Sequence, residues 1–140
     1  MKEPLYTNDI LRLAASLREP RELEREDGRA EVRSPTCGST ISLAVQLDEE
    51  RRVLAVSQQV QACAFGQAAA ALVEDHALGR SHSDVADAML GLSRWLAGTG
   101  DDDGGWPGLA ALEPARTRNA RHAAILLPFR ALLQAMENAR

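Results

Sequence analysis

The chain has 140 residues, of which 45% are hydrophobic and 26% are charged, a composition typical of a folded domain with its own core. Its net charge of −4 provides no broad positive field for nucleic acid, and aromatic residues, at 4%, are too few for a single-strand stacking surface. The longest strongly apolar run, residues 123–129, is about a third of a membrane span, and the start lacks the apolar segment of a secretory signal. We therefore expect one domain, residues 1–140, in the cytoplasm, that binds neither nucleic acid nor a membrane.

Hydrophobic spacing predicts a helix over residues 6–17, with Thr7 or Asn8 as its cap, followed by a charged loop. Three short strands are predicted at about 30–33, 41–47 and 53–60. The second strand alternates strictly, which predicts one buried face and one face, with Ala44 and Gln46, turned toward water. Short links between consecutive strands favour an antiparallel sheet.

After Cys63 the apolar spacing becomes helical. Further helices are predicted at 64–78, 84–96 and 119–137. The glycine-rich acidic stretch 98–108 predicts a flexible loop, in which Trp106 is a candidate lid or partner anchor. This order of elements predicts an α+β domain: a three-stranded antiparallel sheet with helices packed on one face.

The two cysteines are the main candidates for chemistry. Cys37 lies in a turn between the first two strands, where Pro35 fixes one backbone angle and Gly38 permits a positive one. Cys63 lies where the third strand gives way to a helix, and the positive end of that helix favours the thiolate, which is the reactive and metal-binding form. Both thiols are at strand ends of one sheet, so we expect them to lie close together. The alternative is that both cysteines only pack in the core.

Other candidate groups are weaker. His122, near the start of the last helix, is the best histidine candidate for a metal site. The sequence has no Cys-x-x-Cys pair, no histidines at i, i+4 and no glycine-rich phosphate loop after a strand. A ready zinc site or nucleotide site is therefore not predicted.

These motifs together resemble the iron–sulfur cluster assembly scaffold family, the IscU/SufU/NifU N-terminal domain group. The resemblance covers nearly the whole chain: Tyr6 before the first helix, Pro35–Gly38 before an alternating strand, Cys63 opening an alanine-rich helix, and finally Ile125–Phe129. The fold that the resemblance implies, a SufE/NifU-like sheet with helices on one side, agrees with the elements predicted above.

In that family three cysteines and an aspartate surround an exposed pocket that holds zinc or a nascent [2Fe–2S] cluster and accepts sulfur from a cysteine desulfurase. Cys37 and Cys63 match the first two cysteines. Ser39 stands at the aspartate position, and the third cysteine falls on Ala124 or, in a second alignment, on Ala123. The resemblance therefore implies a site with two of the four usual ligands replaced.

The substitutions leave the ligand set open. One chain offers Cys37, Cys63 and His122, which is offset by one residue from the family's histidine, and such a set would make a labile site for iron or zinc. Two chains of a homodimer would offer four thiolates, the common set for a cluster.

Three functions follow as hypotheses, none of them an ordinary enzyme. The first is a scaffold that transiently binds iron or a [2Fe–2S] cluster through Cys37 and Cys63, with a cysteine desulfurase and cluster-acceptor or chaperone proteins as partners. The second is a SufE-like protein that carries sulfur as a persulfide on Cys63, without metal. The third is a degenerate member that binds no metal and acts as a regulatory partner.

Overall fold

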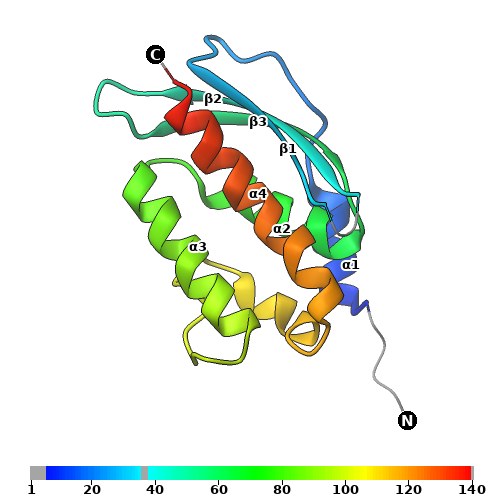
Figure 1. Ribbon diagram of the computed structural model, residues 1–140. Coiled ribbons are helices and arrows are strands. Elements are labelled where there is room, and N and C mark those ends of the chain that lie inside the picture. The colour runs from blue at the N-terminus through cyan, green and yellow to red at the C-terminus, as the bar shows by residue number, and fades with distance from the viewer. Residues whose placement is uncertain (1–5, 36–37, 140) are drawn as a thin grey trace.

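The structure, a computed structural model, describes residues 6–35 and 38–139 and has the order helix, three strands, helices (Figure 1). Its elements are α1 (Asn8–Ser16), β1 (Gly28–Arg33), β2 (Thr40–Leu47), β3 (Val53–Gln61), α2 (Ala64–His76), α3 (His82–Leu96), the 3₁₀ helix η1 (Leu109–Ala115) and α4 (Asn119–Glu137). Every predicted strand and helix is present, and η1 is an addition that the sequence did not predict. No helix in the described ranges has the length and apolarity that a membrane crossing requires.

The three strands form one sheet in the order β1-β2-β3, with both pairs antiparallel. Leu43 at the centre pairs with Ala30 on β1 and Gln58 on β3. Ile41, Leu43 and Val45 alternate along β2 and are at most 1% exposed, so they define the inner face of the sheet. The predicted α+β class and the antiparallel pairing are confirmed.

Helices cover the inner face in two layers (Figure 1). The long helix α4 packs on β1 and β2, while α2 packs on β3 and on α4. A β-carbon at Gly28 would overlap the carbonyl oxygen of Ala135, so α4 lies directly on β1 only because residue 28 is glycine. The second layer consists of α3 and η1 on α4, and of α1 on α2.

The connection between α1 and β1 covers part of the outer face of the sheet. Its backbone is bound at the start by the hydroxyl of Ser57 on β3, which accepts the N–H of Arg21 at 2.8 Å. Its end is bound to β2, since a carboxylate oxygen of Asp27 accepts the N–H of Leu47 at 2.7 Å. We call residues 17–27 the crossing segment. Ala44 and Gln46 point to this face and are nevertheless buried, so the prediction that they meet water was wrong.

Trp106 belongs to the core and is neither a lid nor an exposed anchor, so that prediction was wrong. Its side chain is 1% exposed, and its indole N–H donates to the carbonyl oxygen of Leu72 at 2.8 Å. Its ring meets Phe129 edge-on at 5.2 Å, and the guanidinium of Arg80 lies 4.6 Å from its centroid. Trp106 thus fastens the segment before η1 onto α2 and α4.

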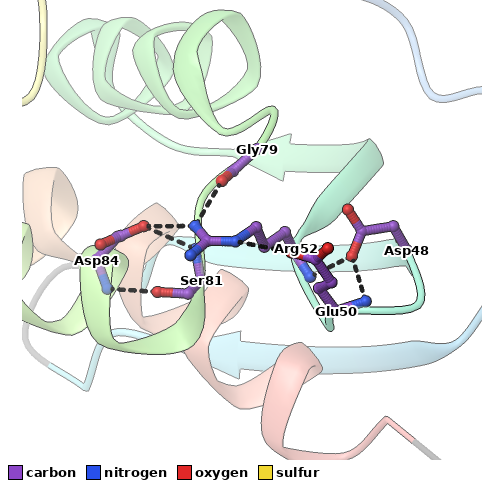
Figure 2. Close-up of polar contacts among 6 residues, drawn as sticks. All are labelled: Asp48, Glu50, Arg52, Gly79, Ser81 and Asp84. Carbon is purple, nitrogen blue, oxygen red and sulfur yellow. Dashed lines mark hydrogen bonds and ion pairs between the residues drawn. The ribbon is translucent and has the colours of Figure 1, made fainter.

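The turn between β2 and β3 is bound to the start of α3 by a polar network (Figure 2). Asp48 accepts the backbone N–H of Arg52 at 2.9 Å, and the Arg52 guanidinium donates to Gly79 and lies 3.3 Å from Asp84. Ser81 and Asp84 form a capping box on α3, and these hydrogen bonds lower the pKa of Asp84 below its ordinary value. This end of the sheet is therefore held by structural contacts, and it is opposite to the end where the cysteines are predicted.

Candidate functional site

The turn that contains Cys37 and the end of β3 lie at the same end of the sheet. Thr40, the first residue of β2, pairs with Arg33 on one side and with Gln61 on the other. The turn is closed by a 2.9 Å hydrogen bond from the Ser34 N–H to the Ser39 carbonyl, and Gly38 has the predicted positive φ, 72°. Cys37 itself and Thr36 lie outside the described residues. The shared sheet end that the sequence predicted is confirmed for the residues on either side of them.

Cys63 is the N-cap residue of α2 and follows β3 by two positions. Its backbone is extended, at φ −67° and ψ 172°, and its carbonyl accepts the N–H of Gln67 at 2.9 Å, which closes the first helical turn. No side chain caps this helix, so the amide groups of the first turn and the positive helix end act on the partly exposed thiol.

Ala124, one of the two positions at which the resemblance implies the family's third cysteine, faces the first turn of α2. A β-carbon placed on Gly66 would lie 3.4 Å from both the Cβ and the carbonyl oxygen of Ala124, and 2.7 Å from the Cβ of Ala62. Glycine at residue 66 therefore allows α4 to approach α2 one turn after Cys63. Sequence reasoning missed Gly66, although a glycine within an alanine-rich helix is a signal of close packing.

Ser39 is 5% exposed and directly precedes β2, so it lies at the sheet end described above. A serine hydroxyl is a poor ligand for zinc or cluster iron, which prefer thiolate and imidazole. Ala124 is 1% exposed and has no donor atom beyond its backbone. Neither position therefore offers a side chain suited to bind zinc or cluster iron.

His122 is held by a hydrogen bond between its Nε2 and the carbonyl oxygen of Ala115 at 2.8 Å. A carbonyl can only accept, so Nε2 carries a hydrogen in this contact. Metal-binding histidines are commonly oriented by such a bond to a backbone carbonyl. However, His122 and Ala124 are about 200° apart around the helix, and His122 contacts η1 while Ala124 faces α2. Its role as a ligand stays a prediction.

A metal site needs several ligand side chains that converge on one point. Within ranges 6–35 and 38–139, no three histidine, cysteine, aspartate or glutamate side chains converge in a way that could hold a metal ion. The chain has two cysteines, and of these Cys63 lies among the described residues and Cys37 does not. A closed, resident metal site built from the described part of one chain therefore does not fit.

The chain is an α+β protein that has a sheet with helices on one face and a cysteine at the N-cap of α2. Comparisons with known proteins show the family to which it belongs. The model of the NifU-like N terminal domain family matches residues 5–91, and the chain belongs to this family. The matched range contains Cys37 and Cys63 and ends before Ala124.

Solved structures extend the similarity to nearly the whole chain. The N-terminal part of a nitrogen-fixing NifU-like protein from Brucella abortus is 28% identical, with a TM-score of 0.87 over 96% of this chain and 93% of that one. A putative iron–sulfur cluster assembly scaffold protein for the SUF system from Fervidobacterium islandicum is 17% identical, with a TM-score of 0.83 over 94% and 96% of the two chains, and shares the fold. No curated protein matches the chain.

Proposed function

We propose that this protein is an iron–sulfur cluster assembly scaffold that binds iron, or a transient [2Fe–2S] cluster, through Cys37 and Cys63. The observation that carries the proposal is the place of Cys63, at the uncapped start of α2 and at the sheet end to which the Ser34–Ser39 turn belongs. Family membership supports it. In this proposal the chain works as a single cytoplasmic domain, takes sulfur from a cysteine desulfurase and passes its cargo to acceptor or chaperone proteins.

The reduced ligand set favours a cluster shared between two chains. Clusters of the [2Fe–2S] type are commonly held by four thiolates, and one chain has two cysteines. A homodimer that brings two Cys37–Cys63 pairs together would complete the set. A single chain, with His122 as a third ligand, would hold one iron or zinc ion more weakly.

Anaerobic reconstitution with ferrous iron, cysteine and a cysteine desulfurase tests the proposal. The wild-type chain should gain the visible absorbance of a cluster, and Cys37→Ser and Cys63→Ser should each abolish it. Ala64→Ser is the matched control, because it adds a hydroxyl beside Cys63 and removes no thiol. Size-exclusion chromatography should show the absorbance in the dimer fraction. Full cluster uptake by either cysteine variant would contradict the proposal.

A second function, sulfur transfer without metal, is favoured by the place of Cys63, a free and partly exposed cysteine at the start of α2. In this reaction the Cys63 thiolate attacks the terminal sulfur of a persulfide on the donor protein. The new bond joins Sγ of Cys63 to that sulfur, the donor's S–S bond breaks, and the donor cysteine leaves as a thiolate. Neither protein needs an external oxidant or reductant.

Intact-mass measurement on metal-free protein separates the two functions. After treatment with desulfurase and cysteine in the presence of a chelator, a persulfide carrier gains sulfur, and Cys63→Ser does not. If the wild-type chain gains no sulfur under these conditions, yet takes up a cluster when iron is present, sulfur transfer without metal is excluded.

A further inference from the structure

The strand β1 forms one edge of the sheet, since it pairs with β2 and with no other described strand. Among the described helices and strands it contacts β2 and α4, and α4 lies on the inner face (Figure 1). On the outer face of β1, Glu31 and Arg33 are exposed and border a hollow of about 400 Å³ that reaches Gln59 and Gln61 on β3. The half of β1 nearest the Ser34–Ser39 turn is therefore open to a partner strand.

The backbone groups of β1 alternate between those that bond to β2 and those that point away from it. The hydrogen bond from the Ser34 N–H to the Ser39 carbonyl sets this alternation. It directs the N–H and C=O groups of Arg29, Glu31 and Arg33 toward the free side of the strand.

Arg29 differs from the other two outward residues because its carbonyl is already bound. The side-chain amide of Asn138 donates to this carbonyl at 3.0 Å, which also confirms that the carbonyl points outward. Within residues 6–35 and 38–139, no hydrogen bond crosses the free side of β1 at the backbone of Glu31 or Arg33. These two residues keep two donors and two acceptors for another strand.

A second copy of β1 fits this edge, and the charges select its register. Backbone bonding requires that an outward residue of one strand lies opposite an outward residue of the other. In antiparallel pairs centred on Glu31 or on Arg33, the central residue meets its own copy, and like charges directly opposite each other are destabilising. A pair centred on Val32 places Glu31 opposite the partner's Arg33, and Arg33 opposite the partner's Glu31, so opposite charges meet at both positions.

The bond from Asn138 excludes one further register. A pair centred on Ala30 would also join opposite charges, since Arg29 would lie opposite the partner's Glu31. That pair needs the backbone carbonyl of Arg29, which Asn138 occupies. The charges and this hydrogen bond therefore select the same register, centred on Val32.

The residue at the centre of this pair is apolar. The side chain of Val32 packs against the core on the inner face and is partly exposed. In the pair it would lie against its own copy, which removes apolar surface from water at the twofold axis. Charged residues on an edge strand commonly prevent strand pairing. On β1 the signs of the charges alternate, and this alternation permits pairing in the register centred on Val32.

We propose that two copies of this protein pair through their β1 strands, centred on Val32, and join their three-stranded sheets into one continuous sheet. Because the strands run in opposite directions, the two copies of Ser34 would lie four residues apart along the pair, or about 13 Å. The turns that follow Ser34 are then at opposite ends of the interface. This dimer needs neither iron nor a thiolate, and it differs from the cluster-bridged dimer proposed above.

Sedimentation velocity of metal-free protein, over a range of concentrations and with a chelator present, tests the proposal. We expect a dimer that dissociates on dilution, since a short edge gives weak association. Glu31→Arg and Arg33→Glu each make the facing charges alike, and each should raise the dissociation constant about thirtyfold, equivalent to about 2 kcal/mol for the two facing pairs. Both substitutions together restore opposite charges and should restore the dimer.

Glu49→Arg is the matched control, because it makes the same charge reversal at an exposed position of the β2–β3 turn. Hydrogen exchange at residues 30–34 should slow as the protein concentration rises, and Cys37→Ser and Cys63→Ser should dimerise as the wild type does. A monomer at every concentration would overturn the proposal, as would a double variant that dimerises no better than the single ones, or loss of the dimer in either cysteine variant. Because iron is absent throughout, failure of this dimer leaves the proposed cluster uptake to be decided by reconstitution.

Discussion

Restoring the third thiolate should convert the transient site into one that retains metal. The substitution is Ala124→Cys, at the position that faces the first turn of α2. Its neighbour on α2 is Gly66, which has no side chain.

The expected gain in zinc affinity can be worked out from the binding free energy of structural zinc sites. Structural zinc binds with roughly 10–16 kcal/mol when four ligands hold it, which is about 3 kcal/mol for each ligand. Since about 1.4 kcal/mol corresponds to a factor of ten, one added thiolate should tighten zinc binding by about a hundredfold. The added sulfur atom in a buried position should cost about 1 kcal/mol of stability in the metal-free chain.

Competition between the protein and a chromophoric zinc chelator measures this change directly. Ala123→Cys is the matched control, since the alternative alignment puts the third cysteine there and the neighbouring residue points about 100° away on the helix. We expect the gain in Ala124→Cys and not in Ala123→Cys. Equal affinity of Ala124→Cys and the wild type, with both chains folded, would refute the argument that Ala124 faces the same site as Cys63.

Three further predictions concern stability and are read from thermal melts. Trp106→Phe loses the indole bond to Leu72 and should cost about 2 kcal/mol, or roughly 6–8 °C in Tm; an unchanged Tm would contradict the core role of Trp106. Gly66→Ala gains about 1 kcal/mol of helix propensity but brings a methyl group to 2.7 Å from Ala62, so we expect a net loss of about 1 kcal/mol, and a rise in Tm would show that the contact relaxes freely. Glu74 has a pKa raised by burial, so the native state binds its proton more tightly than the unfolded state, and stability falls as pH rises through and above its ordinary value of 4.5. Glu74→Gln should therefore raise Tm at neutral pH and lose that advantage at lower pH, and the same difference at every pH would contradict the assignment.

The parts of the fold that depend on local patterns were predictable. Strict alternation in residues 41–47 identified β2, and the change from strand to helical spacing placed Cys63 at a helix start, where the structure has it. Each of these features depends on neighbours within one or two turns of the chain. The Pro35–Gly38 sequence likewise predicted the turn that precedes β2.

Contacts between distant segments were not predictable from local pattern. Trp106 lies in a stretch of glycines and aspartates that is typical of an exposed loop, and it is buried only because Leu72, Arg80 and Phe129 meet it. Gln46 follows the pattern of a solvent-facing residue, yet the crossing segment covers its face of the sheet. Alternation along a strand indicates which residues share a face of the sheet. It does not indicate which other segment of the chain packs on that face.

The sequence identified the candidate cysteines of the site. It did not predict how the residues around them are arranged in space. Cys63 could be assigned from its place at the strand–helix junction, and Cys37 stays a prediction because it lies outside the described residues. The contact between Gly66 and Ala124 joins residues that are 58 positions apart in the sequence, so no local signal reveals it. That contact places Ala124 beside the first turn of α2.

The measurement that tests the central claim most directly is native mass spectrometry of the protein purified without oxygen, before and after exposure to desulfurase, cysteine and ferrous iron. One spectrum resolves iron, sulfide, added sulfur and oligomeric state. The scaffold account predicts iron and sulfide on a dimer, lost in both Cys37→Ser and Cys63→Ser. Sulfur on Cys63 without iron would contradict that account in favour of persulfide transfer. A bare chain under every condition would contradict both and leave the regulatory partner that binds no metal.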